Sequence, residues 1–205
     1  MKRRLGSGSL VIATHNAGKL EEFARMLAPL GLACRSSAAL GLPEPAETED
    51  SFEGNARIKA RAAMAATGQP ALADDSGLEI DALGGAPGVR TADWAQTPQG
   101  RDFGMAMARA WSELEAAGAP EPRRARFRAT LVLLWPDGRE ACFEGAVEGR
   151  IVWPPRGAVG HGFDPIFRPD GHERTFGEMA PAEKDAISHR AVALRRMMAS
   201  LGSLA

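Results

Sequence analysis

The chain has 205 residues, of which 44% are hydrophobic and 25% charged, a composition typical of a globular protein large enough to bury a substantial core. Its net charge of -1 predicts no general affinity for nucleic acid or membranes, so an anionic ligand would need a few placed cations. Cys34 and Cys142 form neither a disulfide framework nor a zinc motif, and no apolar run is long enough for a membrane span or secretory signal. We expect a cytoplasmic protein with a single domain over residues 1–205, in which residues 1–9 form a flexible extension.

A short apolar run, a polar loop and a helix are predicted at the start of the chain. Residues 10–13 (LVIA) predict a buried strand, and the apolar positions further on predict a helix that Asn16 can cap. The intervening loop, THNAGK at 14–19, would direct backbone N–H groups and the Lys19 ammonium towards one point, a geometry that binds phosphate. The spacing of a Walker loop is missing, and a capped helix with an exposed lysine is the alternative interpretation.

An acidic, proline-containing loop at residues 43–50 (PEPAETED) precedes a second predicted helix, from about Ser51 to Thr67. Most acids of the loop are expected to be solvated. Within the helix, Asn55 and Lys59 are four residues apart and therefore share one face. A polar pair of this kind is usually solvated, and a shared functional role is the alternative.

Two adjacent carboxylates, Asp74 and Asp75, follow a short apolar run at residues 71–73. We expect Ser76 and Gly77 to end the strand, which would place the acids at the rim of a sheet, where a hard cation can meet water and substrate. Because successive strand residues point to opposite faces, one acid would face the site and the other would support it. Taken alone, the segment is more typical of an Asp-Asp-Ser-Gly surface turn.

The rest of the chain is expected to alternate between loops, helices and a hairpin. The predicted segments are a glycine-rich loop at 84–88, a helix at 98–117, a β-hairpin from 126–135 and 140–152, a Pro/Gly-rich loop at 153–162 and a helix at 181–201. Four arginines within 123–128 could form a nucleic-acid patch, but the apolar residues alternating with them favour a strand with one polar face. This order of elements predicts an α/β fold with a mixed sheet and helices packed on it.

Together, several segments resemble the inosine triphosphate/xanthosine triphosphate pyrophosphatase family over residues 11–201. They are THNAGK (14–19), SFEGNARIKA (51–60), LADDSGLEIDALGGAPGV (72–89), GHGFDPIF (160–167) and EKDAISHR (183–190). The resemblance implies an elongated mixed β-sheet with flanking helices, two lobes around a central nucleotide cleft, and a homodimer. It further implies that ITP, dITP and XTP are hydrolysed to the monophosphate and pyrophosphate with Mg²⁺ as cofactor, and that neither nucleic acid nor membrane is a partner.

The same resemblance assigns roles to single residues. Asp75 matches the general base and a metal ligand, supported by Asp74, and Glu47 lies where relatives carry another metal-binding carboxylate. The neighbouring acids leave the register of that loop open by one or two residues. Phosphate contacts are implied for residues 14–19 and Lys59, and purine contacts for the C-terminal positions. The implied substrate-binding residues are Thr14, His15, Asn16, Ala17, Gly18, Lys19, Lys59, Ser76, His161, Gly162, Phe163, Asp164, Lys184, His189 and Arg190.

Two positions depart from the family pattern. His161 replaces a phenylalanine that is common in relatives, so its stacking on a base would be weaker and pH-dependent, with Phe163 as the retained aromatic platform. Asp93 stands where a basic residue is expected, and Arg90 is a candidate to replace that residue. The rival interpretations are a pyrophosphatase of pyrimidine nucleotides and a nucleotide-binding module without catalysis.

Overall fold

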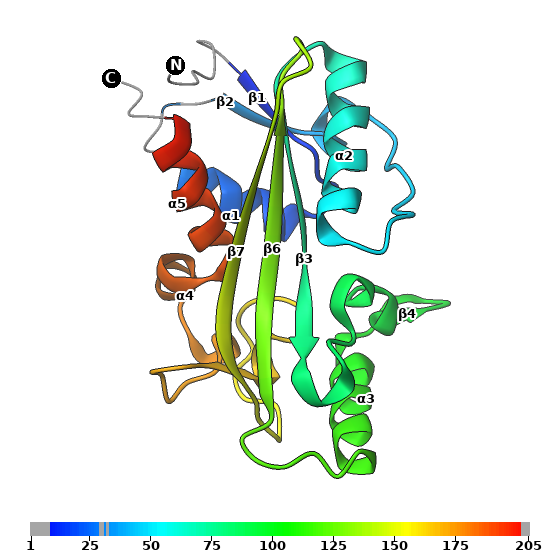
Figure 1. Cartoon of the computed structure of the whole chain (residues 1–205), viewed down its shortest axis with the longest axis vertical. Helices are drawn as coiled ribbons and strands as arrows, with labels where there is room; N and C mark the ends of the chain where they lie inside the picture. Colours follow the sequence, from blue (N-terminus) through cyan, green and yellow to red (C-terminus); the bar gives the residue numbers. More distant parts are fainter. Residues whose placement is uncertain (1–8, 29–30, 32, 202–205) are drawn as a thin grey trace. The chain divides into compact units, whose positions relative to one another are not determined.

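The computed structural model describes residues 9–28, 31 and 33–201 and has an α/β architecture (Figure 1). The helices are α1 (Ala17–Leu27), α2 (Phe52–Thr67), α3 (Phe103–Ala116), α4 (Pro181–Ile187) and α5 (His189–Leu201). The strands are β1 (Ser9–Ile12), β2 (Ala33–Ser36), β3 (Ala71–Ile80), β4 (Gln96–Thr97), β5 (Gly100–Arg101), β6 (Arg124–Leu134), β7 (Glu140–Ile151) and β8 (Phe167–Pro169). The predicted extension at residues 1–9 lies outside the described residues, apart from Ser9, which begins β1.

Six strands form one mixed sheet in the order β2-β1-β3-β6-β7-β8. β1 pairs in parallel with β2 and with β3, whereas β7 and β8 are antiparallel. The predicted hairpin is present as β6 and β7, and its turn is closed by a hydrogen bond of 2.9 Å from the Trp135 N–H to the Arg139 carbonyl. The predicted fold class, a mixed sheet with flanking helices, is confirmed.

The chain divides into two compact units, and β3, β6 and β7 each contribute residues to both. Unit 1 comprises Met1–Asp75, Ala129–Gly145 and Arg190–Ala205, and unit 2 comprises Ser76–Arg128 and Ala146–His189. Each unit has a hydrophobic core of its own, described below.

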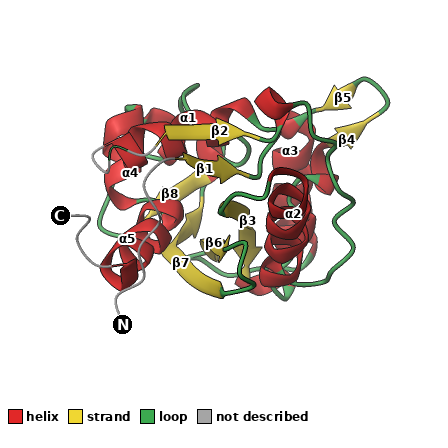
Figure 2. Cartoon of the chain, turned by 90° about the horizontal axis from the view of Figure 1, so that it is seen from above, coloured by secondary structure: helices red, strands yellow, loops and turns green. Residues whose placement is uncertain are grey.

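Helices cover both faces of the sheet in unit 1 because apolar side chains alternate along its strands (Figure 2). Leu10 and Ile12 of β1 pack with Phe23 of α1 and with residues of α5. Val11 and Ala13, which point to the other face, pack with small residues of α2. The sheet of unit 1 is therefore enclosed on two sides, so a polar side chain on either face must find its partner on a helix.

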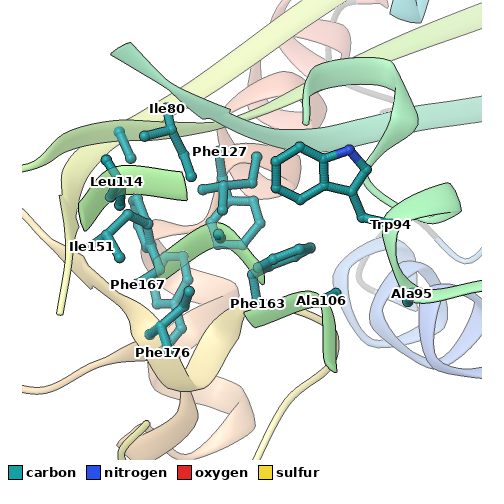
Figure 3. Close-up of a cluster of buried hydrophobic side chains, with 14 of the residues drawn as sticks. Ile80, Trp94, Ala95, Ala106, Leu114, Phe127, Ile151, Phe163, Phe167 and Phe176 are labelled. Carbon is teal, nitrogen blue, oxygen red and sulfur yellow. The ribbon is translucent and has the colours of Figure 1, made fainter. Parts of the chain in front are cut away.

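Aromatic side chains build the core of unit 2 (Figure 3). The ring of Phe127 on β6 packs against Phe167 of β8, with centroids 4.7 Å apart. Phe163 meets Phe103 of α3 edge to face at 5.9 Å. The His189 ring stacks on the Phe127 ring, with centroids 5.0 Å apart and an interplanar angle of 14°. The predicted purine-binding segments are thereby anchored on buried aromatic rings.

The strand that carries the two acids is longer than predicted. β3 does not stop at Asp75 but continues through Ser76 and Gly77 to Ile80. Pairing with the neighbouring strands overrides the local turn preference of Ser and Gly. The expectation that the acids lie at a strand end, and the alternative of a surface turn, are both wrong: the acids lie in the middle of a buried strand.

Two helix boundaries also differ from the prediction. The third helix begins at Phe103, not near residue 98, because Asp102 caps it and residues 96–101 form the small β4-β5 ladder. The predicted helix at 181–201 is two helices, because Ser188 has an extended backbone with ψ of 158°. In the described part of the chain, no helix combines the length and apolarity needed to cross a membrane.

Candidate functional site

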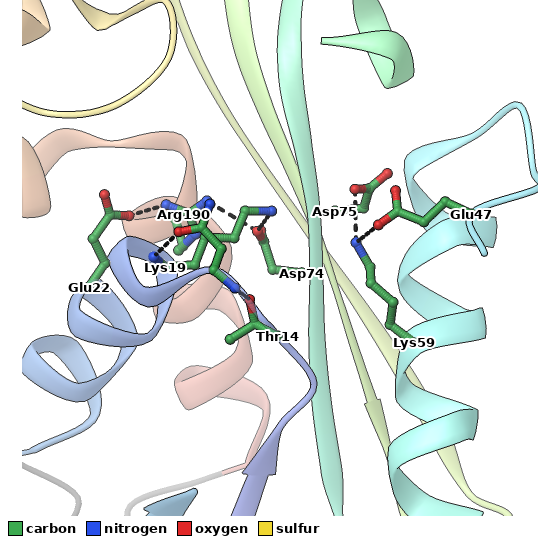
Figure 4. A network of polar contacts seen from close by, with 9 residues as sticks. Thr14, Lys19, Glu22, Glu47, Lys59, Asp74, Asp75 and Arg190 are labelled. Atoms are coloured by element: carbon green, nitrogen blue, oxygen red, sulfur yellow. Dashed lines mark hydrogen bonds and ion pairs between the residues drawn. The ribbon is translucent and has the colours of Figure 1, made fainter. Parts of the chain in front are cut away.

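Asp74 and Asp75 occupy the middle of β3, and both are buried, with 4% and 6% of their surface exposed. Because they are neighbours on a strand, their side chains leave opposite faces of the sheet (Figure 4). The prediction that the two acids do different jobs agrees with this geometry, since each meets its own cations. Asp74 faces Lys19 and Arg190, and Asp75 faces Lys59.

Asp74 is held by two cations on one face of the sheet. Its Oδ2 lies 2.6 Å from the Lys19 ammonium and 3.1 Å from a guanidinium nitrogen of Arg190, which also pairs with Glu22 of α1. Burial opposes the charge of Asp74, but Arg190 and Lys19 outweigh it and hold the pKa of this carboxyl well below its ordinary value. Asp74 therefore stays ionised and holds the Lys19 ammonium in place.

The predicted phosphate loop at residues 14–19 has the expected strand, loop and helix form. The Asn16 side-chain oxygen caps α1 by accepting the Lys19 N–H at 3.1 Å, and the Asn16 N–H donates to Thr14 Oγ1 at 3.1 Å. His15 donates from its ring Nε2 to the Leu42 carbonyl at 2.7 Å, so this side chain ties the loop to the protein. Asn16 and Ala17 are exposed, which leaves this end of α1 open to solvent.

Asp75 shares a cation with Glu47 on the other face. The Lys59 ammonium lies 3.0 Å from Asp75 Oδ1 and 2.9 Å from Glu47 Oε1. Burial raises the pKa of Asp75, and repulsion from Glu47 acts in the same direction, which together outweigh the attraction of the lysines. Burial would lower the pKa of Lys59, but Asp75 and Glu47 outweigh it and raise that pKa. Glu47 and Asp75 thus share one ammonium, and the metal-binding role of Glu47 stays a prediction.

The oxygen atoms on this face fit a magnesium ion. Asp75 Oδ2 is buried and has no hydrogen-bond partner among the described residues, and the Glu47 side chain is 37% exposed. Magnesium takes one or two protein carboxylates and fills its other positions with water and substrate phosphate. In the described ranges, no group of three or more His, Cys, Asp or Glu side chains could hold a metal. Asp75 and Glu47 could therefore supply oxygen ligands to a magnesium ion, whose binding stays a prediction.

In unit 2, the predicted purine-binding residues gather around Asp164, which is buried. Its Oδ2 accepts the Lys184 ammonium at 2.6 Å and the His161 backbone N–H at 2.7 Å. Gly160 has a φ of +85°, and a Cβ there would lie 2.1 Å from the same oxygen. Asp164 thus holds both the loop at 160–163 and the Lys184 side chain.

Phe163 does not form the stacking platform that the sequence predicted. Its side chain is only 1% exposed and belongs to the core of unit 2, because its ring packs against Phe103. The exposed ring of this segment is His161, and Gly162 between them is half-buried. An aromatic contact with a base from this loop would therefore have to come from His161.

Residues 10–200 match the model of the Ham1 family. This chain belongs to that family. Proteins named dITP/XTP pyrophosphatase are similar to it: one from Ruegeria pomeroyi is 59% identical, with 97% of each chain covered, and one from Brucella melitensis biotype 1 is 54% identical, with 94% of this chain and 93% of the relative covered. The predicted family and the predicted enzyme class, a hydrolase, are confirmed.

Solved structures of Ham1 proteins have the same fold. A HAM1 protein from Coxiella burnetii has a TM-score of 0.84 and 38% identity, with 92% of this chain and 95% of that chain covered. A nucleoside-triphosphatase/dITP/XTP pyrophosphatase from Mycobacterium abscessus has a TM-score of 0.72 and 39% identity, with 93% and 98% covered. The mixed sheet described above is therefore the fold of the Ham1 family.

Several other predicted residues have a clear place in this Ham1 chain. Ser76 is half-buried in β3, and the exposed Arg90 and Asp93 lie in consecutive 3₁₀ turns. Arg190, assigned to the purine by resemblance, has its guanidinium on Asp74 and Glu22, and its purine contact stays a prediction.

Glu22 belongs to the same network but was not among the predicted site residues. It is buried on α1, three residues after Lys19, so both side chains lie on one side of the helix. Arg190, which pairs with Glu22, lies far away in the sequence. The spacing from Lys19 was therefore the one available signal.

The arginines at 123–128 follow the predicted strand with one polar face, because buried and half-buried residues alternate at the start of β6. Each arginine has an acidic partner within unit 2. The pairs are Arg123 with Glu115, Arg124 with Asp170, Arg126 with Glu148 and Arg128 with Glu79. These pairs offset the positive charge that a nucleic-acid patch would need.

Replacing Arg190 with methionine should destabilise the protein strongly. The change leaves Glu22 and Asp74 buried without their shared cation, and breaking a buried ion pair in this way costs about 3–5 kcal/mol. Arg61→Met is the matched control, because the Arg61 side chain is 64% exposed, and surface changes usually cost less than about 0.5 kcal/mol. Urea unfolding measures both, and equal small losses would contradict the buried network.

The pKa of Asp75 should respond in opposite directions to its two neighbours. Carboxyl ¹³C titration of the metal-free protein should give a pKa above the ordinary aspartate value. Lys59→Met removes a cation that favours the charged form and should raise the pKa further, whereas Glu47→Gln removes a repulsive charge and should lower it. Two shifts of the same sign would show that the charges on this face are arranged differently.

Proposed function

We propose that this Ham1 protein hydrolyses the non-canonical purine nucleoside triphosphates ITP, dITP and XTP to the nucleoside monophosphate and pyrophosphate. The proposal draws its substrate class from the relatives named dITP/XTP pyrophosphatase. The observation that carries the proposal is the position of Asp75, a buried carboxylate that shares the Lys59 ammonium with Glu47. The preceding residue, Asp74, holds Lys19. Two lysines and an acid with a free oxygen are the groups that attack on a phosphoanhydride requires.

The charges of a triphosphate repel a water nucleophile, and the cations of unit 1 would offset that repulsion. Lys19 and Lys59 would bind phosphate oxygens and stabilise the departing pyrophosphate. Asp75 would orient the attacking water and accept its proton. Asp74 would not touch the reacting atoms; it would hold Lys19 in position.

Mg²⁺ is the cofactor in this proposal, and Asp75 and Glu47 would hold it. When bound, the ion would stabilise the negative charge on the phosphate oxygens more strongly than the lysines alone can. The support is the partnerless Asp75 oxygen and the exposed Glu47 carboxylate beside it.

The residues matched to the family's purine contacts would select the base. Hypoxanthine and xanthine carry an oxo group at position 6, whereas adenine carries an amino group. A donor such as Lys184, His189 or Arg190 favours the oxo group and leaves the amino group opposed. Guanine also has a 6-oxo group, so its rejection would come from position 2. Family membership is also the ground on which we propose a homodimer in the cytoplasm.

A substrate panel tests the proposed activity. With Mg²⁺ present, ITP, dITP and XTP should each release pyrophosphate, and dATP, dTTP and UTP should be cleaved far more slowly. Product identification separates pyrophosphate from free phosphate. Preference for dTTP or UTP would favour a pyrimidine enzyme, and nucleotide binding without any product would favour a binding module.

Asp75→Asn should abolish most of the turnover while leaving nucleotide binding measurable. Loss of a general base costs about 10²–10⁴-fold in rate, and the amide keeps the shape of the side chain. Asp137→Asn is the control, because Asp137 is an exposed acid paired with Arg139. A variant that keeps a tenth of the wild-type rate would remove Asp75 from this role.

A further inference from the structure

A buried side chain of α2 holds the acidic loop at residues 43–50. Asn55 is 2% exposed, and its amide makes two hydrogen bonds with the backbone of Glu49. The Glu49 N–H donates to Asn55 Oδ1 at 3.0 Å, and Asn55 Nδ2 donates to the Glu49 carbonyl at 3.1 Å. A side-chain amide has both a donor and an acceptor, so Asn55 satisfies this backbone residue completely.

The glycine before Asn55 supplies the space for the same loop. A Cβ at Gly54 would lie 2.6 Å from Glu49 Cβ and 2.7 Å from Glu49 Cγ. Glycine inside a helix costs about 0.5–1 kcal/mol relative to alanine, so the position is unfavourable for α2 itself. The close approach of Glu49 therefore explains why a glycine stands at this position inside α2. We call Gly54 and Asn55 together the loop dock.

A second contact joins the loop to the helix one turn further on. Glu47 reaches Lys59, four residues after Asn55, at 2.9 Å. The two residues from Glu47 to Glu49 span at most about 7 Å when extended, and the four residues from Asn55 to Lys59 rise about 6 Å along the helix. The spacing of the contacts along the loop therefore matches their spacing along α2. Because the Glu47 side chain is 37% exposed, packing around that side chain does little to order it. The contacts of Glu49 with the loop dock and of Glu47 with Lys59 lie about one helical turn apart on α2.

We propose that the loop dock is a positioning device for the Glu47 carboxylate, and that Asn55 and Gly54 thereby set the affinity of the protein for a divalent cation. This inference rests on the proposed function, in which Glu47 and Asp75 hold Mg²⁺. Neither dock residue touches substrate or cation. Without the dock, the loop would have to be ordered each time the cation binds, and the entropy lost then would weaken binding.

Three variants of α2 test the proposal. Asn55→Ala removes the two hydrogen bonds, and Gly54→Ala displaces Glu49 while improving helix propensity. Thr67→Ala is the matched control, because it removes a hydrogen bond of 2.7 Å to the Ala63 carbonyl at the far end of the same helix. Mn²⁺ titration followed by electron paramagnetic resonance gives the cation affinity directly, and the Mg²⁺ dependence of ITP hydrolysis gives it a second time.

Both dock variants should bind Mn²⁺ about 10-fold or more weakly than wild type, as is usual when a residue that orients a metal ligand is lost. Their kcat at saturating Mg²⁺ should stay near the wild-type value, and Thr67→Ala should match wild type throughout. Hydrogen exchange of the Glu49 amide should speed up in Asn55→Ala. This readout reports the dock without any need for catalysis.

The outcomes separate the dock from the activity. Faster Glu49 exchange with unchanged Mn²⁺ affinity, or no Mn²⁺ binding by the wild type, overturns the positioning role. Weaker Mn²⁺ binding in both dock variants of a protein that cleaves no ITP supports the dock and refutes the proposed function. If Asn55→Ala does not fold, Gly54→Ala decides the matter, because it keeps every hydrogen-bonding group.

Discussion

The structure of unit 1 depends on the burial of two neighbouring carboxylates in one strand. An ionised carboxylate that leaves water must be paired, and two of them side by side on one face would also repel each other. The alternation of a β-strand separates Asp74 from Asp75 and sends each to a different face. Each face must then supply a cation of its own, which α1 and α5 provide for Asp74 and α2 provides for Asp75.

This requirement explains several local features that otherwise appear unrelated. The Asn16 cap sets where α1 begins and so where Lys19 lies on it. Ser51 does the same for α2 and Lys59, because its hydroxyl accepts the Gly54 N–H at 3.1 Å. Small residues on α2 let the helix lie close to the sheet, within reach of Asp75. Capping and packing thus act at a distance on the charges of the site.

Much of this could be predicted from the sequence where the signal is local. Both caps, at Asn16 and Ser51, follow from residue type and position, and the opposite orientation of the two acids follows from strand geometry alone. The remaining features depend on contacts between distant segments. β3 passes through Ser76 and Gly77 because neighbouring strands pair with it, and Glu22 is explained only by an arginine from the other end of the chain.

The buried position of Phe163 has a similar cause. An aromatic residue in a glycine-rich loop suggests a surface for stacking, but the fold of unit 2 places α3 beside this loop and takes the ring into its core. The family resemblance made Phe163 the aromatic platform, but a sequence motif carries no information about the direction of one ring. Side-chain direction depends on the neighbours that the fold brings, and His161 is the ring left at the surface.

The alternation along β3 also constrains how the gene for this protein can change. Inserting or deleting a single codon between Ala71 and Asp74 would shift the register by one residue and turn every later side chain of the strand to the other side. Each acid would then leave the cations that it now meets, and apolar residues would face the wrong helices. Because Ala71, Leu72 and Ala73 are fully buried, both the residues and the length of this segment are constrained.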